Sequence, residues 1–139
     1  MAHATTKTMN FKNLMITETI VSFGFGLIYI FYPQYLVEEY LVDKTGFNDT
    51  ARIIGLHYGS LMCTVGIIAW LARNAQPSIA RRSITLLTCL SCIWVIFISF
   101  YALANHLETE AIWLTIIILA IMATWAGYLL WKEKDLSLN

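Results

Sequence analysis

Charged side chains are scarce in this sequence. Asp, Glu, Lys and Arg make up 13% of its 139 residues, and nine basic side chains balance nine acidic ones. A soluble domain carries about 25% charged residues, so the shortage excludes an ordinary soluble domain and a disordered tail. The lack of a basic excess excludes an electrostatic nucleic-acid binder. Three cysteines provide no disulfide framework.

Familiar catalytic motifs are missing as well. The sequence contains no nucleophile triad, no phosphate-binding loop and no metalloprotease motif. The pair Cys89-x-x-Cys92 resembles a redox or metal motif only as a string, because no second Cys/His pair lies beside it on a hydrophobic segment. We therefore expect a protein that is not an enzyme and has no metal site.

What the sequence does contain is long hydrophobic runs. A helix that crosses a bilayer needs about 20 mostly apolar residues. Four segments meet this requirement, at about 14–32, 51–71, 83–103 and 111–131. We predict an all-α, polytopic membrane protein in which residues 1–139 form a single antiparallel bundle of four transmembrane helices. The short connections after the second and third segments predict that helices adjacent in sequence pack against each other.

The charges divide unevenly between the two sides of such a bundle. One side carries seven bases and two acids, namely Lys7, Lys12, Arg73, Arg81, Arg82, Lys132, Lys134, Glu133 and Asp135. The other carries two bases and six acids, namely Lys44, Arg52, Glu38, Glu39, Asp43, Asp49, Glu108 and Glu110. Because Lys and Arg accumulate on the cytoplasmic side, we predict that both termini are cytoplasmic, in a membrane of the bacterial inner-membrane type.

The segment 33–50 between the first two spans has two readable features. Apolar positions three to five residues apart near Leu36 and Tyr40 are compatible with a short helix on the outer leaflet, although a plain polar loop fits nearly as well. Asn48-Asp49-Thr50 matches a glycosylation sequon. We interpret it instead as the amino-terminal cap of the second span.

The second span has two distinct faces. Gly55, Gly59 and Gly66 fall on one side of a helix, and this spacing of small residues lets a neighbouring helix approach closely. His57, Ser60 and Thr64 fall on nearly the opposite side. We predict helix packing at the glycine face, and either packing or contact with another protein at the polar face.

Glu18 is the one acid inside a span. A carboxylate at that depth costs on the order of 2.5–3.5 kcal/mol on insertion scales. It shares a stripe of the first helix with Ser22, Gly26 and Tyr29, so it is expected to face protein rather than lipid. Glu18 is a candidate proton or ion site. The alternative is a carboxyl group that stays near the inner headgroups or is protonated and bonded to a threonine of the third span.

His57 is the one histidine inside a span. Imidazoles bind haem iron, metals and quinone headgroups, and His57 together with Tyr101 and His106 forms a candidate cofactor site. The alternative is a neutral histidine bonded to Tyr101 or another group across the bundle. Because Glu18 lies nearer one face of the membrane and His57 nearer the other, we expect them not to touch.

The run Ala51-Arg52-Ile53-Ile54-Gly55, with Gly59, Gly66, Trp70, Ala72-Arg73 and Arg81-Arg82, resembles small uncharacterised bacterial four-helix membrane proteins. The resemblance covers the second span and the loop after it. It implies the four-helix architecture and carries no activity, cofactor or site residue with it.

Three functional classes are consistent with these features. We favour a non-catalytic accessory subunit or assembly factor of a larger membrane complex, which would contact the lipid bilayer and either other membrane subunits or further copies of itself, and no nucleic acid. The first alternative is a binding module for a lipophilic cofactor (haem, quinone or pigment) near His57. The second is a small proton-coupled transporter that uses Glu18, although the charge bias argues against the dual topology of small multidrug transporters.

Overall fold

The protein is a multi-pass membrane protein with an all-α, four-helix architecture. The computed structural model describes residues 10–133; Lys7, Lys134 and Asp135, which entered the charge count, lie outside these residues. The elements, in chain order, are α2 (Phe11–Phe31), α3 (Pro33–Tyr40), the 3₁₀ helix η1 (Lys44–Gly46), α4 (Asp49–Ala72), α5 (Ile79–Ala104) and α6 (Ile112–Lys132). Helices α2, α4, α5 and α6 are long and apolar enough to cross a membrane, which confirms the predicted fold class.

Local sequence explains where several helices begin and end. The Asn48 side chain accepts a hydrogen bond from the backbone N–H of Ala51 at 2.9 Å, so the prediction of a helix cap at this position is confirmed. Helix α2 stops before Pro33, whose ring cannot continue a helix. The same proline occupies the first turn of α3, where its missing N–H costs nothing.

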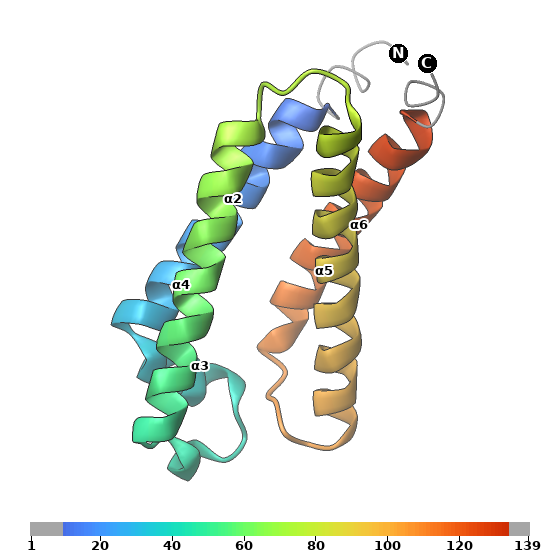
Figure 1. Ribbon diagram of the computed structural model, residues 1–139. Coiled ribbons are helices and arrows are strands. Elements are labelled where there is room, and N and C mark those ends of the chain that lie inside the picture. The colour runs from blue at the N-terminus through green and yellow to red at the C-terminus, as the bar shows by residue number, and fades with distance from the viewer. Residues whose placement is uncertain (1–9, 134–139) are drawn as a thin grey trace.

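Helix α2 packs along α4 to form the first of two hairpins, and α5 packs along α6 to form the second (Figure 1). The glycines of α4 make the first pairing close. A Cβ atom added at Gly59 would lie 2.8 Å from the Gly26 carbonyl oxygen, and one at Gly66 would lie 2.7 Å from the Phe23 ring. The Thr19 hydroxyl also donates to the Gly66 carbonyl at 3.2 Å. The glycine face of α4 is therefore the face that contacts α2.

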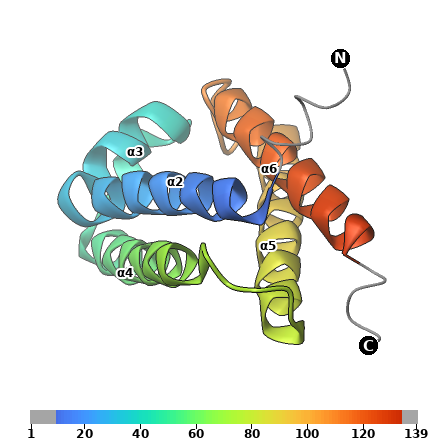
Figure 2. The ribbon, with the colours of Figure 1, turned by 90° about the horizontal axis from the view of Figure 1, so that it is seen from above.

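Helices α4 and α5, although consecutive membrane-crossing segments, are not closely packed partners. This differs from the expectation that a short connection brings neighbouring helices together. The physical reason is that the small residues of α4 are already used against α2, and the view along the helices shows α5 standing apart from α4 (Figure 2). The bundle is thus two hairpins side by side.

At the end where α2 begins and α6 finishes, the hairpins are joined by apolar packing. Six buried residues form one cluster there: Phe11, Leu14, Met15, Ala69, Ala126 and Leu129. Arg81 of α5 lies over the Phe11 ring, 4.3 Å from its centroid, and forms an ion pair with Glu133 just after α6. We refer to this cluster and ion pair as the inner tie, after the side of the membrane on which the sequence predicts this end of the bundle to lie.

At the opposite end, the hairpins are joined through their loops. The backbone N–H of Val42 donates to the Leu107 carbonyl at 3.1 Å, and that of Thr109 donates to the Tyr40 carbonyl at 2.8 Å. Leu41 and Glu108 form an isolated antiparallel β-bridge between these two loops. We refer to this connection as the outer tie.

Candidate functional site: a cavity between the hairpins

Between the two ties a cavity of about 630 Å³ lies between the hairpins. Small-molecule sites in proteins typically occupy roughly 300–1,000 Å³, so the volume suits a single ligand. The lining runs along α2 from Glu18 to Tyr29, and the eleven helical rises between these residues correspond to about 16 Å. The cavity is therefore elongated and lies parallel to the membrane-crossing helices.

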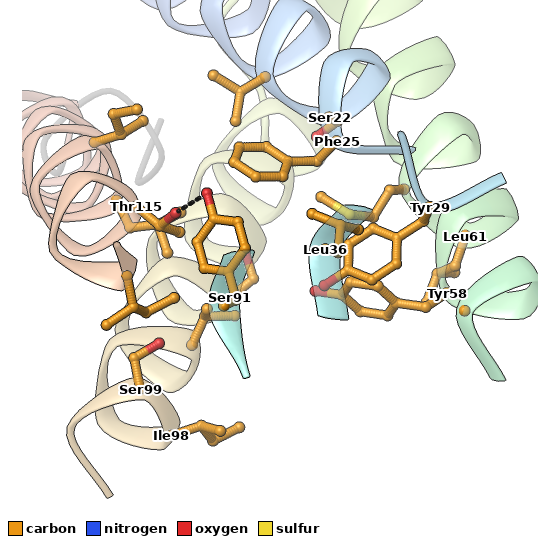
Figure 3. A pocket seen from close by; sticks show the side chains of 18 of the residues that line it. Ser22, Phe25, Tyr29, Leu36, Tyr58, Leu61, Ser91, Ile98, Ser99 and Thr115 are labelled. Atoms are coloured by element: carbon orange, nitrogen blue, oxygen red, sulfur yellow. Dashed lines mark hydrogen bonds between the residues drawn. The ribbon is translucent and has the colours of Figure 1, made fainter. Parts of the chain in front are cut away.

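The wall is predominantly apolar and aromatic. It is formed by α2, α3, α4, α5 and α6 together, and its aromatic members are Phe25, Tyr29, Tyr40, Phe47, Tyr58 and Trp94. The rings of Tyr29 and Tyr58 meet edge to face, with centroids 4.9 Å apart and planes at 82°, across the α2–α4 pair (Figure 3). Such a wall favours a hydrophobic or aromatic ligand body.

Glu18 provides the polar group at the inner end of the cavity. It begins a buried stripe with Ser22 and Gly26, at the helical spacing that the sequence indicated. The Glu18 side chain is 8% exposed, and its Oε1 accepts a hydrogen bond from the Ser22 hydroxyl at 3.0 Å. Its partner is thus on its own helix, whereas the sequence had suggested a threonine of α5. The second oxygen, Oε2, is buried and has no hydrogen-bond partner in residues 10–133.

A second carboxylate, Glu108, lines the outer end. It lies in the loop between α5 and α6, beyond the membrane-crossing helices. Its Oε2 is buried without a hydrogen-bond partner among the described residues, and this burial raises the pKa of the Glu108 carboxyl above its ordinary value. Close by, the Thr115 hydroxyl lies 3.4 Å from the Tyr40 hydroxyl, the contact drawn as a dashed line in Figure 3.

The cavity is open toward the membrane between α4 and α5. Leu61 of α4 and Trp94 and Ile98 of α5 all line it, yet they are 60%, 66% and 62% exposed. Residues that both line a cavity and face the surroundings mark its opening. In a membrane this opening faces lipid, so a lipophilic molecule could enter from the bilayer without crossing an aqueous phase.

The predicted cofactor residues lie elsewhere. His57 is on the exposed side of α4, where its Nδ1 lies 2.8 Å from the Ile53 carbonyl of the same helix. Tyr101 is 66% exposed on α5, and His106 is exposed in the α5–α6 loop with a φ of 54°. None of the three lines the cavity. In the part of the chain that the structure describes, no group of three or more His, Cys, Asp or Glu residues is placed to hold a metal ion.

The glycines singled out from the sequence divide between packing and lining. Gly59 and Gly66 contact α2. Gly55 faces the start of α3, because a Cβ atom added there would lie 3.7 Å from Pro33 Cβ. Gly55 also lines the cavity. Its lack of a side chain leaves room where α2 turns into α3.

Comparison with known proteins adds no relative. No protein-family model, curated protein or solved structure matches this chain.

Sequence reasoning missed several residues of this site. Phe25, Tyr58 and Trp94 were not identified from the sequence. Tyr40 was named only for the apolar face of segment 33–50 and Glu108 only for its charge, although all five residues line the cavity. One usable signal was present in the spacing of apolar residues over 36–41, which places a hydrophobic face on α3. That face is turned toward the cavity, where Leu36 is 7% exposed.

Proposed function

We propose that this protein binds a lipophilic small molecule within the membrane, in the cavity between its two hairpins. The observation that carries the proposal is an apolar, elongated space of about 630 Å³ with carboxylates at its two ends. A protein interior is normally close-packed, so a space of this size between helices calls for an occupant. The proposal retains the lipophilic-ligand class expected from the sequence and moves its site from His57 to the cavity.

The two ties support binding rather than conduction. The inner tie covers the cavity with the buried cluster around Leu14 and Met15, and the outer tie covers it with α3 and the paired loops. Access is left through the lateral opening beside Leu61 and Trp94. A ligand that partitions into the bilayer fits this route.

A direct binding experiment tests the proposal. The purified protein in mild detergent is titrated with 1-pyrenebutanol, a neutral lipophilic probe, and binding is followed by energy transfer from tryptophan to pyrene. Trp94 lines the cavity, so saturable transfer is expected, and it is expected to fall when Trp94 is replaced by Phe.

Two variants distinguish the cavity from the outer surface. Val95→Phe adds a ring to a residue that lines the cavity and is expected to weaken binding about tenfold. Ile93→Phe places the same ring on the lipid-facing side of the same helix, where Ile93 is 36% exposed, and is expected to leave binding unchanged. The absence of saturable binding, or equal binding by both variants, would refute the proposal.

A second candidate function, an accessory subunit of a larger membrane complex, is favoured by the polar face of α4. His57, Ser60 and Thr64 are exposed there, and the two hydroxyls are bonded only to carbonyls of their own helix. Polar side chains that face lipid are costly, and contact with another membrane protein would remove that cost. Photo-crosslinking from position 60 in native membranes tests this candidate: a specific adduct supports it, and lipid adducts alone contradict it.

For the orientation, we propose that both termini are cytoplasmic, as the excess of Lys and Arg at that end predicts, in a bacterial inner membrane. In the structure, the start of α2 and the end of α6 lie at the same end of the bundle, together with Arg73, Arg81 and Arg82 (Figure 1). Cysteines introduced at position 44 in the outer loop should react with a membrane-impermeant maleimide on intact cells. Labelling at position 76 instead would reverse the orientation.

A further inference from the structure

The inner end of the cavity has an acceptor that the protein does not satisfy. Glu18 Oε1 is bonded to the Ser22 hydroxyl, whereas Oε2 is buried without a donor anywhere in the described chain. Glu18 as a whole is 8% exposed and lines the cavity. A buried carboxylate left unpaired carries a large desolvation penalty, so a donor or a positive charge delivered to Oε2 would be strongly favoured.

The cavity itself supplies no such charge. Among the described residues that line it, none is Lys, Arg or His. The other ionisable carboxyl, Glu108 at the outer end, likewise has a buried oxygen without a partner. The electrostatic field inside the cavity is therefore set by acceptors, and it disfavours an anionic ligand such as a fatty acid or a haem propionate.

The wall beyond Glu18 suits the body of a cation. Phe25 lies two helical turns from Glu18 along α2, and the Tyr29–Tyr58 pair follows it. Aromatic faces attract cations as well as apolar groups, and the remaining wall is largely aliphatic. The ammonium group of a ligand at Glu18 would thus be continuous with an apolar or aromatic body along this wall.

We propose that the ligand is a lipophilic amine, bound as its ammonium ion with an N–H donated to Oε2 of Glu18 and its apolar body along Phe25 and Tyr29. This inference rests on the proposed function and adds the chemical class of the ligand. The Ser22 hydroxyl donates to Oε1, so Oε2 is the carboxylate oxygen that is left for the donor of the ligand.

A matched series of probes tests the charge requirement. 1-Pyrenebutylamine, 1-pyrenebutanol and 1-pyrenebutyric acid share one aromatic body and one chain length and differ in the terminal group. Charge-assisted hydrogen bonds are worth about 1.5–3 kcal/mol, so the wild-type protein should bind the amine at least about tenfold more tightly than the alcohol. The acid should bind most weakly.

Variants assign the preference to one carboxylate. Glu18→Gln keeps the side-chain shape and removes the charge, and it should reduce amine affinity to the level of the alcohol while leaving alcohol affinity within about twofold. Glu110→Gln removes an exposed acid that does not line the cavity and should change neither. An independent check needs no variant: the quaternary 1-pyrenebutyl-trimethylammonium ion has the charge but no N–H, and it should bind the wild-type protein more weakly than the amine.

The outcomes separate this inference from the proposed function. If no probe binds saturably, both fail. If the alcohol binds as tightly as the amine, the cavity binds lipophilic molecules but the inference of an amine is overturned. If the amine preference persists in Glu18→Gln, or the quaternary ion binds as well as the amine, the assignment to a hydrogen bond at Glu18 Oε2 is overturned.

Discussion

The close approach of α2 and α4 at Gly59 can be tested by adding a single methyl group. In the structure, a Cβ atom at Gly59 would lie 2.8 Å from the Gly26 carbonyl oxygen, 2.8 Å from Tyr29 Cβ and 2.9 Å from Ile30 Cγ1. The Gly26 carbonyl oxygen and Tyr29 Cβ are fixed by the backbone and cannot rotate away, so Gly59→Ala must push the two helices apart. Overpacking of this kind costs about 1–3 kcal/mol.

The chain provides a matched control for this change. Replacing Gly by Ala in a helix also gains up to about 1 kcal/mol of intrinsic helix propensity, which would mask part of the packing cost. At Gly127, also in a membrane-crossing helix, an added Cβ meets nothing within 4 Å. Gly127→Ala therefore reports the propensity alone, and the difference between the two variants should be about 1–3 kcal/mol.

The measurement is reversible unfolding in mixed micelles with increasing SDS mole fraction, followed by circular dichroism. Gly26→Ala should behave like Gly59→Ala, because its Cβ would lie 2.7 Å from Cys63 Sγ and 2.9 Å from the Gly59 carbonyl oxygen. The double variant should cost less than the sum, since one separation of the helices relieves both contacts. If Gly59→Ala unfolds at the same SDS fraction as Gly127→Ala, the described packing of α2 on α4 is wrong.

Three further predictions concern the ties and a helix cap. Burial raises the pKa of Glu108, so the contribution of this carboxyl group to stability is complete below its ordinary pKa of 4.5 and is lost as the pH rises through the raised pKa. Glu108→Gln should therefore flatten the decline of thermal stability with pH. An unchanged pH profile, or the same flattening in Glu110→Gln, would contradict this prediction. Glu133→Gln should lower the free energy of unfolding by about 1–3 kcal/mol, because it leaves the largely buried Arg81 guanidinium without its carboxylate. If Lys132→Gln lowers the free energy of unfolding by as much, the inner tie is contradicted. Asn48→Ala should lower the free energy of unfolding by about 1 kcal/mol by removing the cap of α4, whereas Asn48→Asp should retain most of the stability. Equal losses of stability in the two variants would exclude capping.

Much of the fold follows from sequence because the bilayer imposes simple rules. Runs of about 20 apolar residues predict the four long helices, and each predicted span overlaps one helix of the structure. The asparagine at 48 predicts the start of α4 for an equally local reason. The glycine spacing identifies the face of α4 that admits a neighbour, although the spacing alone does not say that α2 is that neighbour.

The candidate site depends on information that local patterns do not contain. His57 drew interest as an intramembrane imidazole, but the glycines that pack on α2 leave it on the exposed side of α4. Glu18 was identified because one buried acid is conspicuous in a hydrophobic run. The cavity around it required knowledge of which helices pair and how far apart the pairs stand, and those distances arise from side-chain sizes on several helices together.

The distribution of glycine accounts for the cavity in physical terms. Helices approach closely in membranes where small residues line the contact, and α4 carries Gly59 and Gly66 on the face toward α2. Helix α5 contains no glycine, and its residues that line the cavity include Trp94 and Ile98. Without small residues to admit α4 closely, α5 packs on α6, while the two ties keep the hairpins from separating. The space between them is therefore a consequence of the same residues that stabilise the fold, and the unpaired oxygen of Glu18 lies at its inner end.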